Sequence, residues 1–308
     1  AQANVWSACL YDIRQREYMI FPRVLALAEL TWTPLEKKDF TDFARRVDAA
    51  AKRLDYQGVN YHIPLPEQPG GSCSNLAFTD SISVEFTTSR PEKMVYTLDG
   101  STPSGRHGTV YDRPLGFTDD ALIKIRTVLP GGQMSQVRTI NVRKQSLLPA
   151  TRLDNPVHGL KMSKAYGEFI RVEDLDVARE WETLTLTGLD ELTGQEERPR
   201  DMQNVKFYGA VAEGYVRIPK DGVWRFSTDN DQLWIDGKLV VDNNGLVKRY
   251  SRGDSEIALA EGYHSIKIIF LSNVIGGWTS SRNEGDVSIR LQGDDSFHRL
   301  KPSSLFLP

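Results

Sequence analysis

The spacing of apolar positions changes character along the chain, and the change separates two kinds of structure. In residues 1–62 apolar side chains recur three and four positions apart, as they do on one face of a helix. Beyond residue 63 they alternate at every second position in short runs, with Gly- and Pro-containing turns between them. The pattern predicts a mainly β protein with an α/β N-terminal piece.

The N-terminal piece is predicted to contain one strand and two helices. Residues 1–5 form a short apolar run that ends at Trp6 and is compatible with a buried strand. The first helix is predicted over residues 17–33, with Pro22 in its first turns, and the second over residues 35–56. One strand followed by two helices is an α/β pattern.

Two breaks in composition divide the chain into three predicted domains. A Pro/Gly linker begins at Ile63, and a second break lies near the Leu148-Pro149 pair. We therefore predict domains over residues 1–62, 63–148 and 149–308. Strands are predicted at 83–87, 94–98, 122–128 and 137–142 in one small β-sandwich, and at 215–218, 223–227, 232–235, 238–241, 265–271 and 287–292 in the other.

Composition narrows the class of protein. The net charge of -3 over 308 residues suggests neither a nucleic-acid-binding protein nor a basic membrane binder. No apolar run approaches the roughly 18 residues of a membrane span. Cys9 and Cys73 lie too far apart for a metal or redox motif, and two thiols are favoured over a disulfide. Because Ala1 is not Met and no targeting segment precedes it, we expect the chain to close a domain whose beginning is missing.

Three ordered blocks within residues 2–61 carry a family resemblance. They read Q-A-N-V-W, then E-Y-M-I-F-P-R-V-L-A-L-A-E-L-T-W-T-P, then D-F-A-R-R-V followed by R-L-D-Y-Q-G-V-N-Y. This stretch resembles the last βα unit of a glycoside hydrolase family 20 β-N-acetylhexosaminidase, whose catalytic domain is a (β/α)8 barrel. The resemblance implies that Trp6 is the pocket-wall tryptophan beside the N-acetylated sugar. From composition alone, a core Trp6 under the following helix stays open as the alternative.

The resemblance also implies a reaction. Family members hydrolyse terminal β-linked N-acetylhexosamine with retention, the substrate's own acetamido group attacking the anomeric carbon, and no cofactor is required. The family's catalytic Asp-Glu pair would lie before residue 1, so we expect no catalytic residue in this chain and no activity from it alone. Many members continue as W-x-E, whereas Ala8 stands at the Glu position here and cannot accept a hydrogen bond from the sugar.

The truncation raises a packing problem. One strand and two helices cannot close a barrel, and the apolar face of the first helix would be left exposed. We therefore expect either that the missing N-terminal barrel portion is present as a partner or that residues 1–60 pack against something else.

Two further resemblances cover the rest of the chain. Residues 96–132, with Y-T-L-D-G-S-T-P-S and V-Y-D-R-P-L, are similar to the small immunoglobulin-like domain that follows the barrel in chitobiases and hexosaminidases. We expect it to be a spacer. Residues 156–300, with G-V-W-R-F-S-T-D-N-D-Q-L-W-I-D-G and I-A-L-A-E-G-Y-H-S-I-K-I-I-F, resemble a PA14-type β-sandwich.

The PA14 resemblance implies a second site. In carbohydrate-binding members an acidic pair binds Ca²⁺, and the ion holds sugar hydroxyls. The corresponding loop here is Asp229-Asn230-Asp231, so Asp229 and Asp231 are candidate calcium ligands, although the family's two acids are adjacent and these are not. Trp278 and Asn283 lie in a second loop, and the candidate glycan-binding residues are Asp229, Asn230, Asp231, Trp278 and Asn283. An ordinary Asx turn and a partly buried Trp278 remain the alternative.

The leading hypothesis is the C-terminal region of a secreted, periplasmic or cell-surface β-N-acetylhexosaminidase. Its expected partners are oligosaccharides or glycans with terminal N-acetylhexosamine, with no nucleic acid and no membrane span. The alternative is a non-catalytic glycan-binding or cell-surface interaction protein, which Ala8 and the Asp229–Asp231 loop favour.

Overall fold

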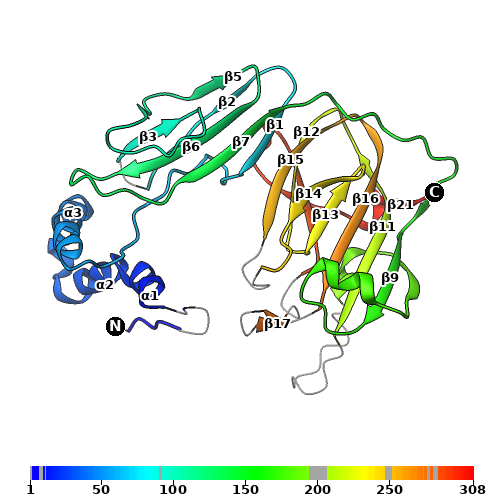
Figure 1. Ribbon diagram of the computed structural model, residues 1–308, viewed down its shortest axis with the longest axis horizontal. Helices are drawn as coiled ribbons and strands as arrows, with labels where there is room; N and C mark the ends of the chain where they lie inside the picture. The colour runs from blue at the N-terminus through cyan, green and yellow to red at the C-terminus, as the bar shows by residue number, and fades with distance from the viewer. Residues whose placement is uncertain are drawn as a thin grey trace. The chain divides into compact units, whose positions relative to one another are not determined.

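In the computed structural model the chain forms two compact units. Figure 1 shows the helices and strands of the chain. The structure describes residues 2–6, 10, 12–89, 92–193, 207–246, 252–272, 274–275, 278–279 and 284–308. The first unit consists of Ala1–Ser72, Ser83–Leu115 and Leu122–Ile140, and the second of Cys73–Ile82, Gly116–Ala121 and Asn141–Pro308. The three-domain division of the sequence stays a prediction. Among the described residues, no helix has the length and apolar character to cross a membrane.

The helices of the first unit differ from those predicted. They are α1 (Ile13–Ile20), α2 (Arg23–Trp32), the 3₁₀ turn η2 (Leu35–Lys37) and α3 (Phe40–Tyr56). The prediction of one helix over residues 17–33 is wrong. The first helix begins at Ile13 because the Asp12 carboxylate accepts the Gln15 N–H at 2.7 Å and caps it. Pro22 then separates α1 from α2, since it has no N–H to continue the helical ladder.

The strand predicted over residues 1–5 does not form over its described residues, 2–5. Residues 2–6 have an irregular, exposed backbone. A strand is stable only when its N–H and C=O groups pair with a neighbour, and no strand in the described part of this unit pairs with residues 2–6. The apolar pattern of this segment alone is therefore insufficient to make it a strand.

Helix α3 is the N-terminal element with a buried face. Val47, Ala51 and Leu54 are buried, and Ala51 packs in a cluster with Ile63 and Leu129. For α3 the second of the two expectations for residues 1–60 holds, because this helix packs against another part of this chain. By contrast, neither α1 nor α2 has a buried residue.

Short strands follow the helices. They are β1 (Asn75–Phe78), β2 (Ile82–Val84), β3 (Lys93–Thr97), β4 (Thr109–Val110), β5 (Leu115–Phe117), β6 (Ala121–Val128) and β7 (Arg138–Lys144). β3 is antiparallel to β4 and β6, whereas β1 is parallel to the end of β7. Ile123 and Ile125 alternate inward along β6 and are fully buried, as the period-two pattern predicts.

The second unit is a two-sheet sandwich. Its elements are β8 (Val157–His158), β9 (Leu160–Tyr166), η3 (Val172–Val177), β10 (Glu182–Leu186), η4 (Leu189–Thr193), β11 (Tyr208–Ile218), β12 (Gly222–Thr228), β13 (Gln232–Ile235), β14 (Lys238–Asp242), β15 (Gly253–Leu259), β16 (Gly262–Leu271), β17 (Val274–Ile275), β18 (Trp278–Thr279), β19 (Val287–Leu291), β20 (His298–Arg299), η9 (Pro302–Ser304) and β21 (Leu305–Leu307). One sheet runs β10-β9-β11-β16-β13-β14, with β21 paired to β11 and β8 paired to β21, and the other runs β15-β12-β19-β20. Phe226, Leu233 and Ile268 are fully buried in the core that the two sheets share. The mainly β class with a helical N-terminal piece is confirmed.

Strand β1 joins the sandwich within the second unit. The Ala77 N–H donates to the Glu256 carboxylate at 3.1 Å, and the Gln292 side chain donates to the Ala77 carbonyl at 3.2 Å. Ala77 also packs against Val223. The nearby Cys73 is a buried thiol whose pKa burial raises to about 12, which makes it chemically inert. Cys9 lies outside the described residues.

Candidate functional site

Trp6, the N-terminal candidate, is largely exposed. Its side chain is 80% exposed, and the neighbouring Val5 is 50% exposed. The alternative of a core Trp6 packed under the following helix is therefore not observed in this chain. Apolar exposure continues along α2, where Trp32 is 87% exposed. Ala8, the position of the missing Glu, lies outside the described residues.

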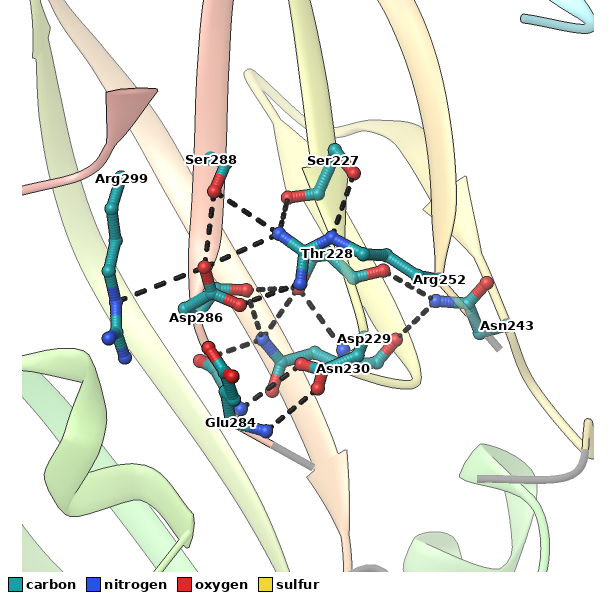
Figure 2. A network of polar contacts seen from close by, with 11 residues as sticks. Ser227, Thr228, Asp229, Asn230, Asn243, Arg252, Glu284, Asp286, Ser288 and Arg299 are labelled. Carbon is teal, nitrogen blue, oxygen red and sulfur yellow. Dashed lines mark hydrogen bonds and ion pairs between the residues drawn. The ribbon is translucent and has the colours of Figure 1, made fainter. Parts of the chain in front are cut away.

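The second candidate site lies at one end of the sandwich. The Asp229–Asp231 loop connects β12 to β13, and residues 284–286 enter β19 directly opposite it (Figure 2). The two segments are far apart in sequence. Their backbones and side chains are joined by hydrogen bonds, as the following contacts show.

Asp229 is held by the backbone of the opposite segment. Its carboxylate oxygens accept the Glu284 N–H at 2.8 Å and the Gly285 N–H at 3.1 Å (Figure 2). Burial nevertheless raises the pKa of Asp229, and the nearby Asp286 charge adds to that effect. The Arg252 charge and the two backbone N–H groups act in the opposite direction and lower it.

Asn230 is fully buried and bridges the two segments. Its amide nitrogen donates to the Thr228 hydroxyl at 2.7 Å and to the Gly285 carbonyl at 3.0 Å. Its side-chain oxygen Oδ1 has no hydrogen-bond partner among the described residues. A buried amide oxygen without a donor is costly, so it marks a place where a donor or a cation would be stabilised.

Asp231 is also fully buried but serves another contact. Its carboxylate accepts the Leu271 N–H at 2.7 Å, and its carbonyl accepts the Asn243 N–H at 2.8 Å. The Asn243 side chain donates to the Asn230 carbonyl at 2.8 Å. Asp229 and Asp231 thus use different partners, the first on the segment before β19 and the second on β16.

An ion pair between Arg252 and Asp286 lies beside the loop. Arg252 and Asp286 form a two-pronged contact, Nη1 to Oδ1 at 2.7 Å and Nη2 to Oδ2 at 3.3 Å (Figure 2). Ser288 donates to the same carboxylate at 3.1 Å, and the Arg299 Nε lies 3.8 Å from it. Burial acts to raise the pKa of Asp286, but the hydrogen bond and charge of Arg252 outweigh it, and the pKa is lowered.

This supporting network was missed by sequence reasoning. Its charged members come from the segments before β15 and β19 and from β20, which the chain order gives no reason to connect. The signal that does exist is weak. Asp286 directly precedes an apolar strand, and a buried acid at such a place requires a cation.

The remaining candidate residues are not placed. Asn283 and the side chain of Trp278 lie outside the described residues, although Trp278 belongs by its backbone to β18. In the part of the chain that the structure describes, no group of three or more His, Cys, Asp and Glu side chains gathers as a metal site. Asp229 and the Asn230 Oδ1 atom offer hard oxygen atoms, the type of ligand that calcium prefers. Their number is smaller than the number of ligands that calcium usually takes.

Three family matches run along the chain in order. The catalytic domain of glycosyl hydrolase family 20 matches residues 1–35, the Fn3 associated family matches 84–142, and the PA14 domain matches 187–301. Residues 1–35 thus resemble family 20, and residues 187–301 resemble a PA14 domain. The resemblance to the C-terminal part of a family 20 enzyme followed by these modules is confirmed, and the loop of Asp229 lies inside the PA14 match.

Curated relatives agree with the family matches. The chain is 47% identical over 306 residues to a Beta-hexosaminidase of Porphyromonas gingivalis, covering 99% of this chain and 39% of that protein. It is 37% identical over 79 residues to a Beta-N-acetylhexosaminidase of Cellulomonas fimi, covering 25% of this chain and 16% of that protein. The chain therefore spans well under half the length of these relatives.

Solved structures similar to this chain include two PA14 domains. The PA14 domain of the MpAFP antifreeze protein is 16% identical, with a TM-score of 0.36, and covers 51% of this chain and 94% of that chain. The PA14 sugar-binding domain from an RTX adhesin is 16% identical, with a TM-score of 0.33, and covers 49% of this chain and 99% of that chain.

Gly285 gives a prediction for the loop of the PA14 domain. Its φ is +65°, and an added Cβ would lie 2.3 Å from the Thr193 methyl group. Gly285→Ala is therefore expected to destabilise the sandwich by about 2 kcal/mol, because backbone strain and a steric clash combine. Gly237 has a similar φ of +72° but open space around it, so Gly237→Ala should cost only about 1 kcal/mol. Denaturant unfolding of both variants tests this, and equal losses would contradict the clash.

Proposed function

We propose that the longer protein containing this chain is a β-N-acetylhexosaminidase. It removes terminal β-linked N-acetylhexosamine residues from oligosaccharides by retaining, substrate-assisted hydrolysis. The observation that carries the proposal is the 47% identity over 306 residues to a protein named Beta-hexosaminidase. Because the chain covers only 39% of that relative, the general acid and the residue that orients the acetamide are assigned to the portion outside it.

In this proposal Trp6 forms one wall of the sugar pocket. An exposed indole ring can stack on the apolar face of a pyranose, and Trp6 is 80% exposed in the chain described here. The exposed side chains of α1 and α2, among them Ile13, Leu30 and Trp32, form the surface against which the remaining (β/α)8 barrel packs. Trp6 would be positioned for sugar when that barrel is complete.

The PA14 domain is proposed to bind glycans at the Asp229–Asp231 loop. Calcium is the proposed ion, with the Asp229 carboxylate and the Asn230 Oδ1 atom as ligands. Asp231 is buried and bonded to Leu271, so its proposed part is to hold the loop in place. Trp278 and Asn283 complete the proposed glycan surface. A glycan substrate and a glycan-binding module both fit a secreted, periplasmic or cell-surface location.

Turnover of an aryl substrate tests the proposed activity. The longer protein is expected to release 4-nitrophenol from 4-nitrophenyl N-acetyl-β-glucosaminide or its galacto epimer, and this chain alone is expected to release none. Absence of turnover by the longer protein on both substrates would overturn the proposal. Turnover by this chain alone would overturn the assignment of the catalytic acid to the missing portion.

A second candidate function is glycan binding without catalysis. The Asn230 Oδ1 atom, which has no hydrogen-bond partner among the described residues and belongs to the residue next to Asp229, favours it, since oxygen atoms of this kind suit a cation that holds sugar hydroxyls. A glycan array probed with this chain, with and without a calcium chelator, measures it. Binding lost on chelation and in Asp229→Ala is the expected result. Binding that persists under both conditions would exclude a calcium-dependent site at this loop.

A further inference from the structure

The outer face of the larger sheet carries a row of charged and aromatic side chains. The strand register places Lys161 of β9 opposite Glu213 of β11, Glu213 opposite Lys267 of β16, and Lys267 opposite Trp234 of β13. Directly paired residues on one face of a sheet have their side chains close together. Four neighbouring strands thus present a continuous polar and aromatic row, on the face opposite to the core.

Only part of this outer face is open. Farther along β16, Ile269 and Leu271 are buried under Phe169 and Leu175, which belong to the segment around η3. Two residues earlier on the same face, Lys267 is only half-buried. The exposed row of side chains therefore begins where the segment around η3 no longer covers the sheet. This row forms one side of a hollow.

The hollow is a groove of about 590 Å³. Lys161, Glu213, Lys267 and Trp234 line it, together with Tyr215, Ser265 and Leu307 among others. Apolar surface for stacking and polar groups for hydrogen bonding are therefore present in one place. Sugar-binding surfaces need both, because a pyranose has an apolar face and a rim of hydroxyls.

Trp234 is held in a fixed orientation. Its indole N–H donates to the Gln232 side-chain oxygen at 3.1 Å, and the Gln232 amide nitrogen donates to Asp242 at 3.2 Å. The Lys267 ammonium lies 5.8 Å from the centre of the Trp234 ring. A ring fixed in this way loses little freedom when a ligand stacks on it.

We propose that this groove binds a saccharide bearing a carboxylate, that is, a chain containing uronic acid. One pyranose stacks on Trp234, and its carboxylate is attracted by the Lys161 and Lys267 ammonium groups. Glu213 stands between the two lysines and keeps the net charge of the row at one positive charge, which favours a single carboxylate over a dense polyanion. The groove shares no lining residue with the Asp229–Asp231 loop and is independent of the proposed hydrolysis.

Calorimetry with matched probes tests the proposal on the 308-residue chain. Hyaluronan hexasaccharide, which contains uronic acid, is expected to bind at least roughly tenfold more tightly than chitohexaose, which has six uncharged rings. A hexaglutamate peptide carries charge without pyranose rings and is expected to bind no better than chitohexaose. Equal binding of the two saccharides, or preference for the peptide, would overturn the proposal.

Variants locate the binding. Trp234→Ala should weaken hyaluronan binding roughly tenfold, and Lys267→Ala roughly threefold, whereas Glu213→Gln should tighten it about threefold by removing the repelling charge. Trp181→Ala is the matched control, since Trp181 is exposed but lies outside the groove. Weaker binding in Glu213→Gln, or an equal loss in Trp181→Ala, would contradict the assignment.

Discussion

Replacing Trp6 by alanine in the longer protein, proposed to be a hexosaminidase, is expected to lower kcat/KM for aryl N-acetyl-β-hexosaminides by roughly 100-fold, because stacking and positioning are lost together. The substrate's acetamido group is the nucleophile in the proposed reaction, so the sugar ring has to be held at a defined angle. An indole wall does this through its flat face. Trp6 is 80% exposed and has no core role that its removal would damage.

The kinetic parameters distinguish positioning from simple binding. If Trp6 orients the acetamido group, the loss should fall mostly on kcat, and Trp6→Phe should restore most of it. Trp181→Ala removes another exposed tryptophan, far along the sequence in the sandwich, and should leave kcat/KM unchanged. Full activity in Trp6→Ala would remove this residue from the substrate pocket.

Replacing Arg252 by methionine is expected to destabilise the sandwich by about 3 kcal/mol, because a buried carboxylate loses its main partner. The Asp286 side chain is 5% exposed, and its two oxygens accept hydrogen bonds from Arg252 and Ser288. Arg299, at 3.8 Å, replaces little of that contact. Because the Asp286 carbonyl also accepts the Thr228 hydroxyl at 2.6 Å, the loop of Asp229 should loosen as well.

A matched ion pair on the surface provides the control. Arg152 and Asp154 lie 3.7 Å apart, with side chains 93% and 89% exposed. Arg152→Met should therefore change the free energy of unfolding by less than about 0.5 kcal/mol. Urea unfolding of both variants makes the comparison. Equal effects would show that the Arg252–Asp286 contact contributes no more than a solvated pair.

The pH dependence of the Arg252 variant follows from the pKa of Asp286. That pKa is lowered in the folded chain, so the pair contributes stability above the unfolded pKa of about 3.9, and the contribution is lost as pH falls through the folded pKa. Without Arg252, burial dominates and favours the protonated acid. The stability difference between wild type and Arg252→Met should thus shrink as pH falls from 7 towards 4. A difference that stays constant over this range would contradict the charge as its origin.

Local patterns predicted six strands of the sandwich, namely β11, β12, β13, β14, β16 and β19, but missed others, among them β9 and β15. Along β13 the predicted range 232–235 is the observed one, because the short apolar run and the Asp236-Gly237 turn act within a few residues. The N-terminal segment behaved differently. Its apolar run predicted a strand, but residues 2–6 have no neighbouring strand in the described chain, and pairing cannot be read from the run itself.

Of the candidate sites, one was predicted from the sequence and one was not. The loop Asp229-Asn230-Asp231 was found from its motif, since three oxygen-bearing side chains in a row are visible in the sequence. That Asp231 faces Leu271 while Asp229 faces Gly285 was not visible, because backbone direction at each residue decides it. The groove of Trp234 was missed altogether. Its members lie on four strands, and each alone looks like an ordinary solvent-facing residue.

The sequence by itself determined that this chain is mainly β, that it begins with a family 20 segment, and that it carries a PA14 domain with an acidic loop. Spacing and local motifs suffice for such statements, since they depend on residues close together in the chain. Only the tertiary structure decided that Arg252 supports Asp286, that Asn230 Oδ1 lacks a partner, and that Lys267 and Trp234 share a groove. These depend on strand order and register, which bring together residues that the chain keeps far apart.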